Sequence, residues 1–555
     1  MLRHGGQILA DQLRLLGVRR VFSVPGESFL AALDGLRDSG IVNIVCRHEG
    51  GAAMMAEAYG KLTGQPGVCF VTRGPGATNA ASGIHIARQD STPLVMFVGQ
   101  IETGHRDRGA FQEIDYRQVF GGLAKWAAEV DQTARLPEYI ARAFTVATSG
   151  RPGPVVLALP EDMLSARVVV PDTRGRVVEL RPDWSGAADS LLRRLRDHQR
   201  PLVIVGGPHW SAQAEADLGR FATQQGLPVA CGLRRQDYLD NRHPHYAGDL
   251  NVGIDPRLAQ RMRDADALLV IGSRLGDIET QGYSLLDPAG HGKAIYHVHA
   301  DPDEPGRVYH PDLAIIAAAP GFVQALAAQP AICAVDPDWT TGARADYLTW
   351  ATPHETPGAV KLEQVVRWLS DNLPGDAILA NGAGNYAAFL HRYFTYKGFR
   401  TQLAPTSGSM GYGFPAAISA SLEYPGRTVV CMAGDGCFQM TLNEMSTAIQ
   451  HGATPIVVVA DNGRYGTIRM HQERHYPGRV SGTDLVNPDF AALARAYGGH
   501  GESVTRTEDF PAAFARAQAA GLPAVIALSL DPEALTTSQT LTQVRDAGFH
   551  AQTVT

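Results

Sequence analysis

Residues 434–462 read GDGCFQMTLNEMSTAIQHGATPIVVVADN, and this stretch decides the fold class. An acidic Gly-Asp-Gly turn leads into a helical pattern and then into an apolar run that ends at Asp461-Asn462. Another apolar run, residues 428–433, directly precedes the turn. The order strand, turn, helix, strand predicts two parallel strands whose carboxyl ends lie side by side.

Oxygen donors gather at these two strand ends. Asp435 offers a carboxylate, Asn462 an amide oxygen and the backbone of Arg464 a carbonyl oxygen. Such oxygens suit Mg²⁺, which proteins often share with a phosphate group. Gly434 and Gly436 let the backbone approach a ligand closely, and the start of the helix leaves N–H donors unpaired. We therefore predict a diphosphate and magnesium site at this turn.

The length of the chain calls for more than one hydrophobic core. With 555 residues and roughly 100–200 residues per domain, we expect three domains. Strand and helix patterns alternate throughout, which predicts an α/β fold of three doubly wound parallel sheets covered on both faces. The predicted domains are residues 1–165, 185–330 and 359–535, with a proline-rich linker at 329–358 and a C-terminal tail at 536–555. The predicted strands are 21–24, 41–45, 67–71, 93–98, 153–160, 201–207, 267–272, 294–299, 377–380, 428–433, 455–460 and 524–530.

Bulk properties exclude several classes of protein. The formal charge of −7 and the lack of a basic cluster interleaved with aromatics argue against nucleic-acid binding. The six cysteines form no CxxC pair, which is typical of a reducing compartment. No apolar run reaches the roughly 18 residues that a membrane span needs. The first residues lack the apolar core of a signal peptide, so we expect a cytoplasmic protein.

Four further motifs occur in a fixed order with the GDG segment. They are RHEGGAAMMAE at 47–57, TRGPGATN at 72–79, AFQEID at 110–115 and SGSMGYGFPAA at 407–417. With these motifs the chain resembles the acetolactate synthase (acetohydroxyacid synthase) branch of the thiamine diphosphate enzymes over residues 20–530. The usual Asn-Asn pair is Asp461-Asn462 here, and the second Asn, the metal-ligand position, is retained.

The resemblance implies both an architecture and a set of cofactors. It implies a pyrimidine-binding domain, a central domain and a diphosphate-binding domain, with thiamine diphosphate between the first domain of one subunit and the third domain of its partner. A homodimer, or a dimer of dimers, would be the active unit. Magnesium would be held by Asp435, Asn462 and the carbonyl of Arg464.

Glu49 is the first candidate for a catalytic residue. It follows a predicted strand and precedes a helix rich in Ala and Met, so we expect a poorly solvated carboxylate whose protonated form is favoured. The matching Glu of the family binds the aminopyrimidine ring and promotes loss of the C2 proton of the thiazolium. The alternative is an ordinary Glu at a helix N-terminus, favoured by the helix dipole.

The resemblance also assigns the remaining site residues. Phe111 and Gln112 would reach the substrate from the partner subunit, and His471 would lie on the substrate side. The alternatives are a solvent-exposed loop pair and a structural His. The implied cofactor contacts, besides Glu49, are Gly26, Gly384, Asn385, Gly408, Met410, Gly434, Asp435, Gly436, Cys437, Asn462, Tyr465 and Gly466. For Met410 the alternative is a core residue, and for the turn at Gly384 a simple strand-to-helix connection.

The implied reaction is decarboxylation of a 2-oxo acid and transfer of the acyl-anion equivalent to a carbonyl acceptor, as in acetolactate formation. Thr467 and His471 stand where acetolactate synthases commonly have Met and Trp, so the acceptor stays open. A benzaldehyde-lyase-like enzyme and a 2-oxo acid decarboxylase are the alternatives within the family. The chain has no adjacent His-His pair, the mark of many simple decarboxylases, which favours ligation or lysis.

The central domain departs from the relatives that bind FAD. Residues 274–278 read RLGDI where those relatives carry Arg-Phe-Asp-Asp-Arg, so FAD stays open, through Arg274 and Asp301. The glycines at 206, 207 and 272 do not form a GxGxxG fingerprint, which tells against a nucleotide-dependent oxidoreductase. A non-catalytic binding protein would be expected to lose Glu49 or the metal ligands, and the chain keeps them.

Overall fold

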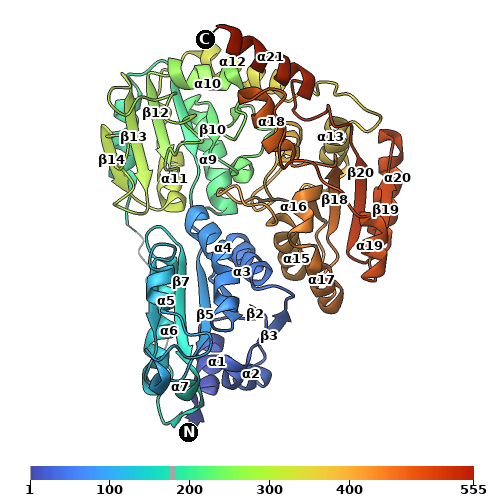
Figure 1. The fold of residues 1–555 in the computed structure, drawn as a ribbon. Coiled ribbons are helices and arrows are strands. Elements are labelled where there is room, and N and C mark those ends of the chain that lie inside the picture. The colour runs from blue at the N-terminus through green and yellow to red at the C-terminus, as the bar shows by residue number, and fades with distance from the viewer. Residues whose placement is uncertain (1, 174–181, 555) are drawn as a thin grey trace.

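The computed structural model describes residues 2–173 and 182–554. Three domains are visible in Figure 1, each built on a six-stranded sheet with helices on both faces. All strand pairs in the three sheets are parallel. The predicted fold class is confirmed, and residues 174–181 of the predicted interdomain connector lie outside the described residues.

The N-terminal sheet has the strand order β3-β2-β4-β5-β7-β6. Its strands are β2 Arg20–Ser23, β3 Val42–Val45, β4 Gly67–Val71, β5 Leu94–Gln100, β6 Trp126–Glu129 and β7 Pro154–Pro160. Its helices are α1 Gly5–Leu15, α2 Leu30–Arg37, α3 Glu49–Thr63, α4 Pro75–Asp90, α5 Tyr116–Phe120, α6 Leu136–Thr148 and α7 Glu161–Ser165. Two short strands, β1 Arg3–His4 and β8 Arg167–Val168, pair antiparallel beside this sheet.

The central sheet has the order β11-β10-β9-β12-β13-β14. Its strands are β9 Pro201–Val205, β10 Val229–Cys231, β11 Tyr246–Asp249, β12 Ala267–Ile271, β13 Ala294–His299 and β14 Leu313–Ile316. Its helices are α8 Ser185–Leu195, α9 Ala212–Gln225, α10 Pro256–Asp264, α11 Ala319–Ala327 and α12 Pro337–Trp350.

The C-terminal sheet has the order β16-β15-β17-β18-β20-β19. Its strands are β15 Ile378–Asn381, β16 Gln402–Leu403, β17 Val429–Gly434, β18 Ile456–Asp461, β19 His500–Val504 and β20 Ala524–Ser529. Its helices are α13 Leu362–Asn372, α14 Asn385–Tyr393, α15 Gly413–Glu423, α16 Asp435–Gln439, α17 Met445–His451, α18 Gly466–His475, α19 Phe490–Ala496, α20 Phe510–Ala519 and α21 Leu541–Val554. Strands β17 and β18 are neighbours, as the opening motif predicts.

Every predicted strand is present, and the strands that sequence patterns missed lie mainly at sheet edges. Besides the short pair β1 and β8, the missed strands are β6, β10, β11, β14, β16 and β19, of which all but β10 are edge strands. Central strands such as β4, β9 and β12 are buried at every position, whereas β6 and β19 each have one buried residue. An edge strand needs no continuous apolar run, so it leaves little signal in the sequence.

The N-terminal and C-terminal domains share one hydrophobic core. A continuous cluster of buried residues includes Ala52 and Met55 of α3 together with Ala416 and Ala420 of α15. The hydroxyl of Ser419 donates to the backbone oxygen of Met55 at 2.9 Å across this contact. The two domains are therefore packed against each other as firmly as elements within one domain.

Two predicted irregular segments are helical in the structure. The linker at 329–358 contains α12, which buries Trp339, Ala343 and Tyr347 against the central domain. The tail at 536–555 contains α21, which lies beside α18 at one end of the molecule (Figure 1). Both helices have 14 residues, but their apolar periodicity was too weak to predict them.

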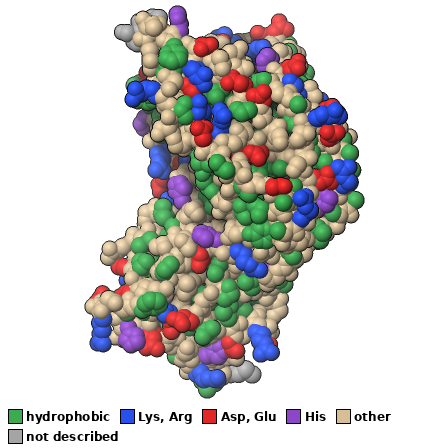
Figure 2. Space-filling view, turned by 45° about the vertical axis from the view of Figure 1, so that its right-hand side comes forward, with side chains coloured by type: hydrophobic (Ala, Val, Ile, Leu, Met, Phe, Trp, Pro, Cys, Tyr) green, Lys and Arg blue, Asp and Glu red, His purple; other side chains and the backbone are tan. Residues whose placement is uncertain are grey.

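The described surface shows no long apolar helix and no single dominant charge. No helix among residues 2–173 and 182–554 has both the length and the apolar character needed to cross a membrane. Acidic and basic side chains are interspersed on the face shown in Figure 2, and hydrophobic side chains gather over its middle. This mixed distribution agrees with the small net charge of the chain.

The docking of α21 on α18 depends on Glu473, so it should weaken in acid. Burial opposes ionisation of Glu473, but Arg545 at 2.9 Å, the N–H of Gly478 at 2.8 Å and Arg469 at 3.1 Å outweigh it and lower its pKa to about 2. The ionised carboxylate therefore stabilises the fold above its ordinary pKa of 4.5, and this contribution is lost as pH falls toward 2.

We expect Glu473→Gln to unfold more easily than wild type at pH 7 and about equally easily once pH approaches 2. Denaturant unfolding at several pH values measures this difference. The matched control is Glu508→Gln, whose side chain is 62% exposed and should contribute little. A stability difference that does not shrink in acid would contradict the role given to Glu473.

Candidate functional site

The Gly-Asp-Gly turn places a buried carboxylate at the carboxyl end of β17. Asp435 is the first residue of α16 and is 3% exposed. Its Oδ1 accepts a hydrogen bond from the N–H of its neighbour Gly436 at 2.8 Å, and its Oδ2 accepts one from the N–H of Gly463 at 2.9 Å. Burial raises the pKa of Asp435, although these hydrogen bonds act in the opposite direction. The carboxylate thus ties the end of β17 to the loop after β18.

The loop after β18 brings the other predicted oxygen donors to the same place. The N–H of Arg464 donates to the side-chain oxygen of Asn462 at 3.3 Å and to Asp435 Oδ2 at 3.3 Å. Asp461, at the end of β18, accepts from the N–H of Gly463 at 3.2 Å. Among the described residues there is no cluster of three or more His, Cys, Asp or Glu side chains suited to a metal. A site here would use one carboxylate with amide and carbonyl oxygens.

Asn487 is a member of this site that the sequence patterns did not reveal. Its side-chain nitrogen donates to Asp435 Oδ2 at 2.7 Å and to Asp461 Oδ1 at 2.7 Å. One amide therefore holds two carboxylates together. Asn487 comes from the loop before α19, where no strand end or glycine motif marks it. Only its position in space identifies it.

A cavity of about 230 Å³ opens beside Asp435. Its lining includes twelve of the predicted cofactor and metal residues: Gly384, Asn385, Gly408, Met410, Gly434, Asp435, Gly436, Cys437, Asn462, Arg464, Tyr465 and Gly466. These residues come from four separate segments at one edge of the C-terminal sheet, after β15, before α15, after β17 and after β18. The parallel sheet explains this convergence, because its strands all end at the same edge.

Glycine at 436 is required by the shape of this cavity. A Cβ at this position would come within 2.5 Å of the Tyr465 ring and 3.2 Å of Leu485.

The side chain of Tyr386, which also lines the cavity, is held by two hydrogen bonds. Tyr386 donates to Cys437 Sγ at 3.3 Å and accepts from the N–H of Gly382 at 3.1 Å. Tyr386 lines the cavity and was missed, because an aromatic residue on a helix pattern reads as core.

The C-terminal segment also contributes to the cavity. Ala534 and Leu535 line it, and the backbone oxygen of Leu535 accepts from Asn385 Nδ2 at 2.9 Å. The Asn385 side-chain oxygen accepts from the hydroxyl of Thr467 at 2.9 Å. Asn385 therefore connects the C-terminal segment to α18.

Glu49 and Gly26 lie in the N-terminal domain and do not line this cavity. Glu49 is the first residue of α3, and Asn79 donates to its Oε2 at 3.0 Å. The carboxylate is half-buried within one protomer, and its poor solvation in the assembled site stays a prediction. The residues that follow Glu49 in the first turn of α3, Gly50, Gly51 and Ala52, are buried.

The turn that carries Glu49 is held by the C-terminal domain. Glu444, which is fully buried, accepts from the N–H of His48 at 2.9 Å and from the N–H of Arg47 at 3.2 Å. A Cβ at Gly51 would come within 2.3 Å of Glu444. The position of Glu49 is thus set by a residue nearly 400 positions further along the chain.

The three predicted substrate residues are not brought together in one protomer. Phe111 is 74% exposed, and Gln112, with φ of 64°, lies against Gly74, where a Cβ would come within 2.8 Å of Gln112 Cβ. His471 stacks on His475 with ring centroids 6.2 Å apart, and it does not line the cavity. Thr467, one turn earlier on α18, does line it.

The floor of the cavity can be tested by adding one methyl group. We expect Gly436→Ala to weaken binding of thiamine diphosphate at least about tenfold, because the Cβ must displace Tyr465 from the cavity wall. Isothermal titration calorimetry of the cofactor-free protein measures the affinity. The control is Gly426→Ala, which meets open space. Equal affinities of the two variants would show that the cavity is not the binding site.

Comparison with known proteins identifies the family. Residues 3–119 match the N-terminal TPP (thiamine pyrophosphate) binding domain of thiamine pyrophosphate enzymes, residues 188–326 match the central domain, and residues 382–528 match the C-terminal TPP binding domain. These ranges lie within the three domains predicted from the sequence.

Individual relatives cover nearly the whole chain. The chain is 31% identical to the acetolactate synthase isozyme 2 large subunit of Escherichia coli (strain K12), over 95% of this chain and 96% of the relative. It is 31% identical to the isozyme 3 large subunit of the same organism, over 91% of this chain and 90% of the relative. It is 30% identical to the acetolactate synthase large subunit of Lactococcus lactis subsp. lactis, over 89% and 87%. The chain therefore belongs to the thiamine pyrophosphate enzymes, and it is a thiamine diphosphate-dependent enzyme similar to acetolactate synthase large subunits.

Proposed function

We propose that this enzyme removes CO₂ from a 2-oxo acid and transfers the remaining acyl group to a carbonyl acceptor, as acetolactate synthases do. The observation that carries the proposal is the single cavity at the end of the C-terminal sheet, where twelve residues predicted from separate motifs gather. The similarity to acetolactate synthase large subunits over nearly the full chain supports the choice of reaction.

Bound thiamine diphosphate supplies a carbon nucleophile and a sink for the electrons released on decarboxylation. The chain's own residues bind and orient the cofactor. Gly434 and Gly436 admit the diphosphate, and Gly408 and Met410, which line the cavity from the opposite loop, hold the pyrimidine. Glu49 would contact the pyrimidine ring with its carboxylate and exchange a proton with it. The apolar lining from Leu535 and Met410 keeps water away.

We propose a homodimer as the smallest active unit. The cavity of one protomer, about 230 Å³, is smaller than the roughly 300–1,000 Å³ of complete ligand pockets. Glu49, Gly26, Phe111 and Gln112 lie outside it, in the N-terminal domain. A partner subunit that presents these residues would complete the site and cover the exposed ring of Phe111. A dimer of two such dimers is compatible with the same contact.

We propose that Mg²⁺ is held by Asp435, the side-chain oxygen of Asn462 and the backbone carbonyl of Arg464. All three residues line the cavity, and their hard oxygen atoms are the donors that Mg²⁺ prefers. The cation would bind the diphosphate to this edge of the sheet. Asp461 adds a second carboxylate close by, held with Asp435 through Asn487.

FAD is not part of the proposed function, because the two candidate residues do not share a cavity. Arg274 lines a separate cavity of about 110 Å³, which Asp301 does not line. The Asp301 carboxylate instead accepts from the N–H groups of Asp303 at 3.0 Å and Arg151 at 3.4 Å. A Cβ on Gly207 would come within 1.9 Å of the Gly272 backbone, so close packing accounts for the glycine at 207, which also lines the cavity of Arg274. The absorption spectrum of the purified protein tests this point.

A cytoplasmic location is also proposed. The described cysteines are all free thiols, and five of the six are buried. This state is typical of proteins that fold in a reducing compartment.

The reaction is tested with the purified protein, thiamine diphosphate and Mg²⁺. A panel of 2-oxo acids, alone and with aldehyde or 2-oxo acid acceptors, is assayed for CO₂ release and for acyloin products. We expect CO₂ release coupled to an acyloin. Release of free aldehyde alone would identify a decarboxylase. Cleavage of acyloins without turnover of 2-oxo acids would identify a lyase, and either result would overturn the proposed reaction.

Glu49→Gln should slow the chemistry without removing the cofactor. The amide retains the size of the side chain but cannot hold the proton, so exchange of the cofactor's C2 proton should fall by orders of magnitude. Nuclear magnetic resonance of the quenched cofactor measures this exchange, and thermal unfolding checks the fold. Unchanged exchange would refute the role of Glu49.

Asn487→Ala should weaken the metal site through the two carboxylates. Without the Asn487 amide, the carboxylates of Asp435 and Asp461 repel each other, and the hydrogen bonds that hold the end of β18 to Asp435 are lost. Mg²⁺-dependent binding of thiamine diphosphate should therefore weaken about tenfold. Asp435→Ala should abolish the dependence on Mg²⁺. The control is Gln439→Ala, which removes only the 2.9 Å contact to the Asn487 oxygen. Equal Mg²⁺ dependence of wild type and Asn487→Ala would contradict this assignment.

A further inference from the structure

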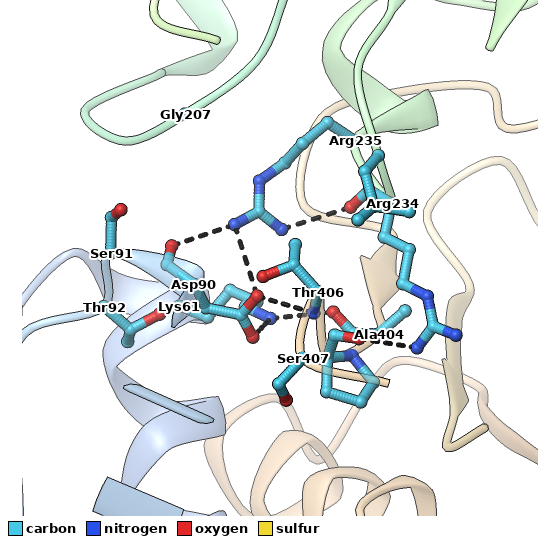
Figure 3. Close-up of polar contacts among 12 residues, drawn as sticks. Lys61, Asp90, Ser91, Thr92, Gly207, Arg234, Arg235, Ala404, Thr406 and Ser407 are labelled. Atoms are coloured by element: carbon cyan, nitrogen blue, oxygen red, sulfur yellow. Dashed lines mark hydrogen bonds and ion pairs between the residues drawn. The ribbon is translucent and has the colours of Figure 1, made fainter. Parts of the chain in front are cut away.

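The loop that carries Gly408 and Met410 is held by side chains of the two other domains. It follows β16, the edge strand of the C-terminal sheet, which has no neighbouring strand on its outer side. Figure 3 shows charged side chains from the N-terminal and central domains converging on residues 404–406. The backbone groups of this segment are satisfied there rather than by its own sheet.

The N-terminal domain contributes Lys61 of α3 and Asp90 of α4. Lys61 Nζ donates to the backbone oxygen of Ala404 at 2.9 Å and to Asp90 Oδ2 at 2.7 Å. Asp90 Oδ1 accepts from the N–H of Thr406 at 2.7 Å. The carboxylate of Asp90 is completely buried, and the Lys61 side chain is 11% exposed. The Lys61–Asp90 ion pair therefore binds this segment at two backbone groups, the oxygen of Ala404 and the N–H of Thr406.

The central domain contributes Arg234, from the loop after β10. Its guanidinium donates to the backbone oxygens of Pro405 at 2.7 Å and Gly382 at 3.0 Å. Arg234 is 6% exposed and has φ of 54°, a conformation that is uncommon for a side chain of this size. The next residue, Arg235, donates to the backbone oxygen of Asp90 at 3.1 Å. The central domain is thus connected both to the loop and to the residue that holds it.

The same domain also covers the open edge of β16. Asp237 Oδ2 accepts from the N–H groups of Thr401 at 3.0 Å and Gln402 at 3.2 Å. The side-chain oxygen of Gln402 accepts from the N–H of Gln236 at 2.9 Å. From residue 401 to residue 406, the outer side of the chain is therefore held by other domains.

The charges in this group are balanced. Burial opposes ionisation of Asp90, but Lys61 and Arg235 outweigh it and keep its pKa below the ordinary value. Glu57, also fully buried, accepts from Tyr412 at 2.5 Å and lies 3.5 Å from Lys61. A buried charge destabilises the folded state unless it is paired. Removing one partner leaves the remaining buried charges unpaired and therefore destabilises the fold. Such a group has one preferred geometry.

We propose that Lys61, Asp90 and Arg234 form an interdomain clamp that positions Gly408 and Met410 for the cofactor. The N–H of Gly408 donates to the backbone oxygen of Pro405 at 3.1 Å, so the clamped segment leads directly into the residues that line the cavity. This inference rests on the proposed cofactor role of Gly408 and Met410. The three residues are positioning residues, because none of them lines the cavity.

The clamp gives the N-terminal and central domains a part in positioning a loop that the C-terminal domain alone does not fix. The loop sits at a sheet edge and contains three glycines between residues 408 and 413, so its own sequence does not fix its path. A shift of about 1 Å in such a loop is enough to impair catalysis strongly. Contacts from two rigid neighbours restrict it.

The test compares two matched acid-to-amide substitutions, Asp90→Asn and Glu304→Gln. Glu304 is 5% exposed and pairs with Arg151 at 2.9 Å, so it too forms a buried ion pair between domains, but neither member touches residues 404–410. The measurements are the affinity for thiamine diphosphate with Mg²⁺ by calorimetry, amide hydrogen exchange over residues 404–410, and thermal unfolding.

We expect Asp90→Asn to weaken the affinity at least about tenfold and to speed exchange of the Thr406 amide, while Glu304→Gln leaves both unchanged. Wild-type affinity and exchange in Asp90→Asn would overturn the proposal. Equal losses in both variants would also overturn it, since they would indicate general loosening of the domains.

A second variant tests the clamp in case Asp90→Asn does not fold. Lys61→Met removes the donor to Ala404 but leaves Asp90 near Arg235, and Lys61→Arg should restore the affinity that Lys61→Met loses. Failure of Lys61→Met to alter exchange over residues 404–410 would contradict the clamp. Absence of cofactor binding in wild type would instead contradict the proposed function, and the exchange data would still decide the clamp.

Discussion

The site depends on one hydrogen-bonded carboxylate, Asp435, at the end of a central strand. Its two oxygens accept from the N–H groups of Gly436 and Gly463 and from the side chain of Asn487. These bonds join the carboxyl ends of β17 and β18 and fix the loop between β18 and α18. The cavity lies on this junction, and the other loops are arranged around it. A buried carboxylate with this many donors has little freedom to move.

The domains contribute to the site in different ways. The C-terminal domain supplies the cavity, the N-terminal domain carries Glu49 outside that cavity, and the central domain supplies contacts at the back of the loop that carries Met410. The contacts also run in the opposite direction, because Glu444 of the C-terminal domain holds the turn before Glu49. With a hydrophobic core shared by α3 and α15, the chain behaves as one framework rather than three separate modules.

Much of the fold and of the site was predictable because the strongest signals lie in buried strands and in glycine turns. The central strands are apolar at every position, and the loops after them contain the glycines and oxygen donors of the cavity. Edge strands such as β16 and β19 gave no comparable signal, since β16 has only two residues and the mostly half-exposed β19 tolerates polar residues. Helix α21 was also missed, because its docking depends on Glu473 and Arg545 rather than on a regular apolar stripe.

The sequence by itself determined the family, the α/β class and the residues around the cavity, because these are carried by local motifs whose spacing reflects one strand and one helix. The tertiary structure alone decided which residues support them. Asn487 joins two carboxylates, Glu444 fixes the turn of Glu49, and Asp90 reaches a loop 316 residues away. These contacts are long-range hydrogen bonds of single polar side chains. No periodicity or motif records them, since each joins segments that are far apart in the sequence and meet only in the folded chain.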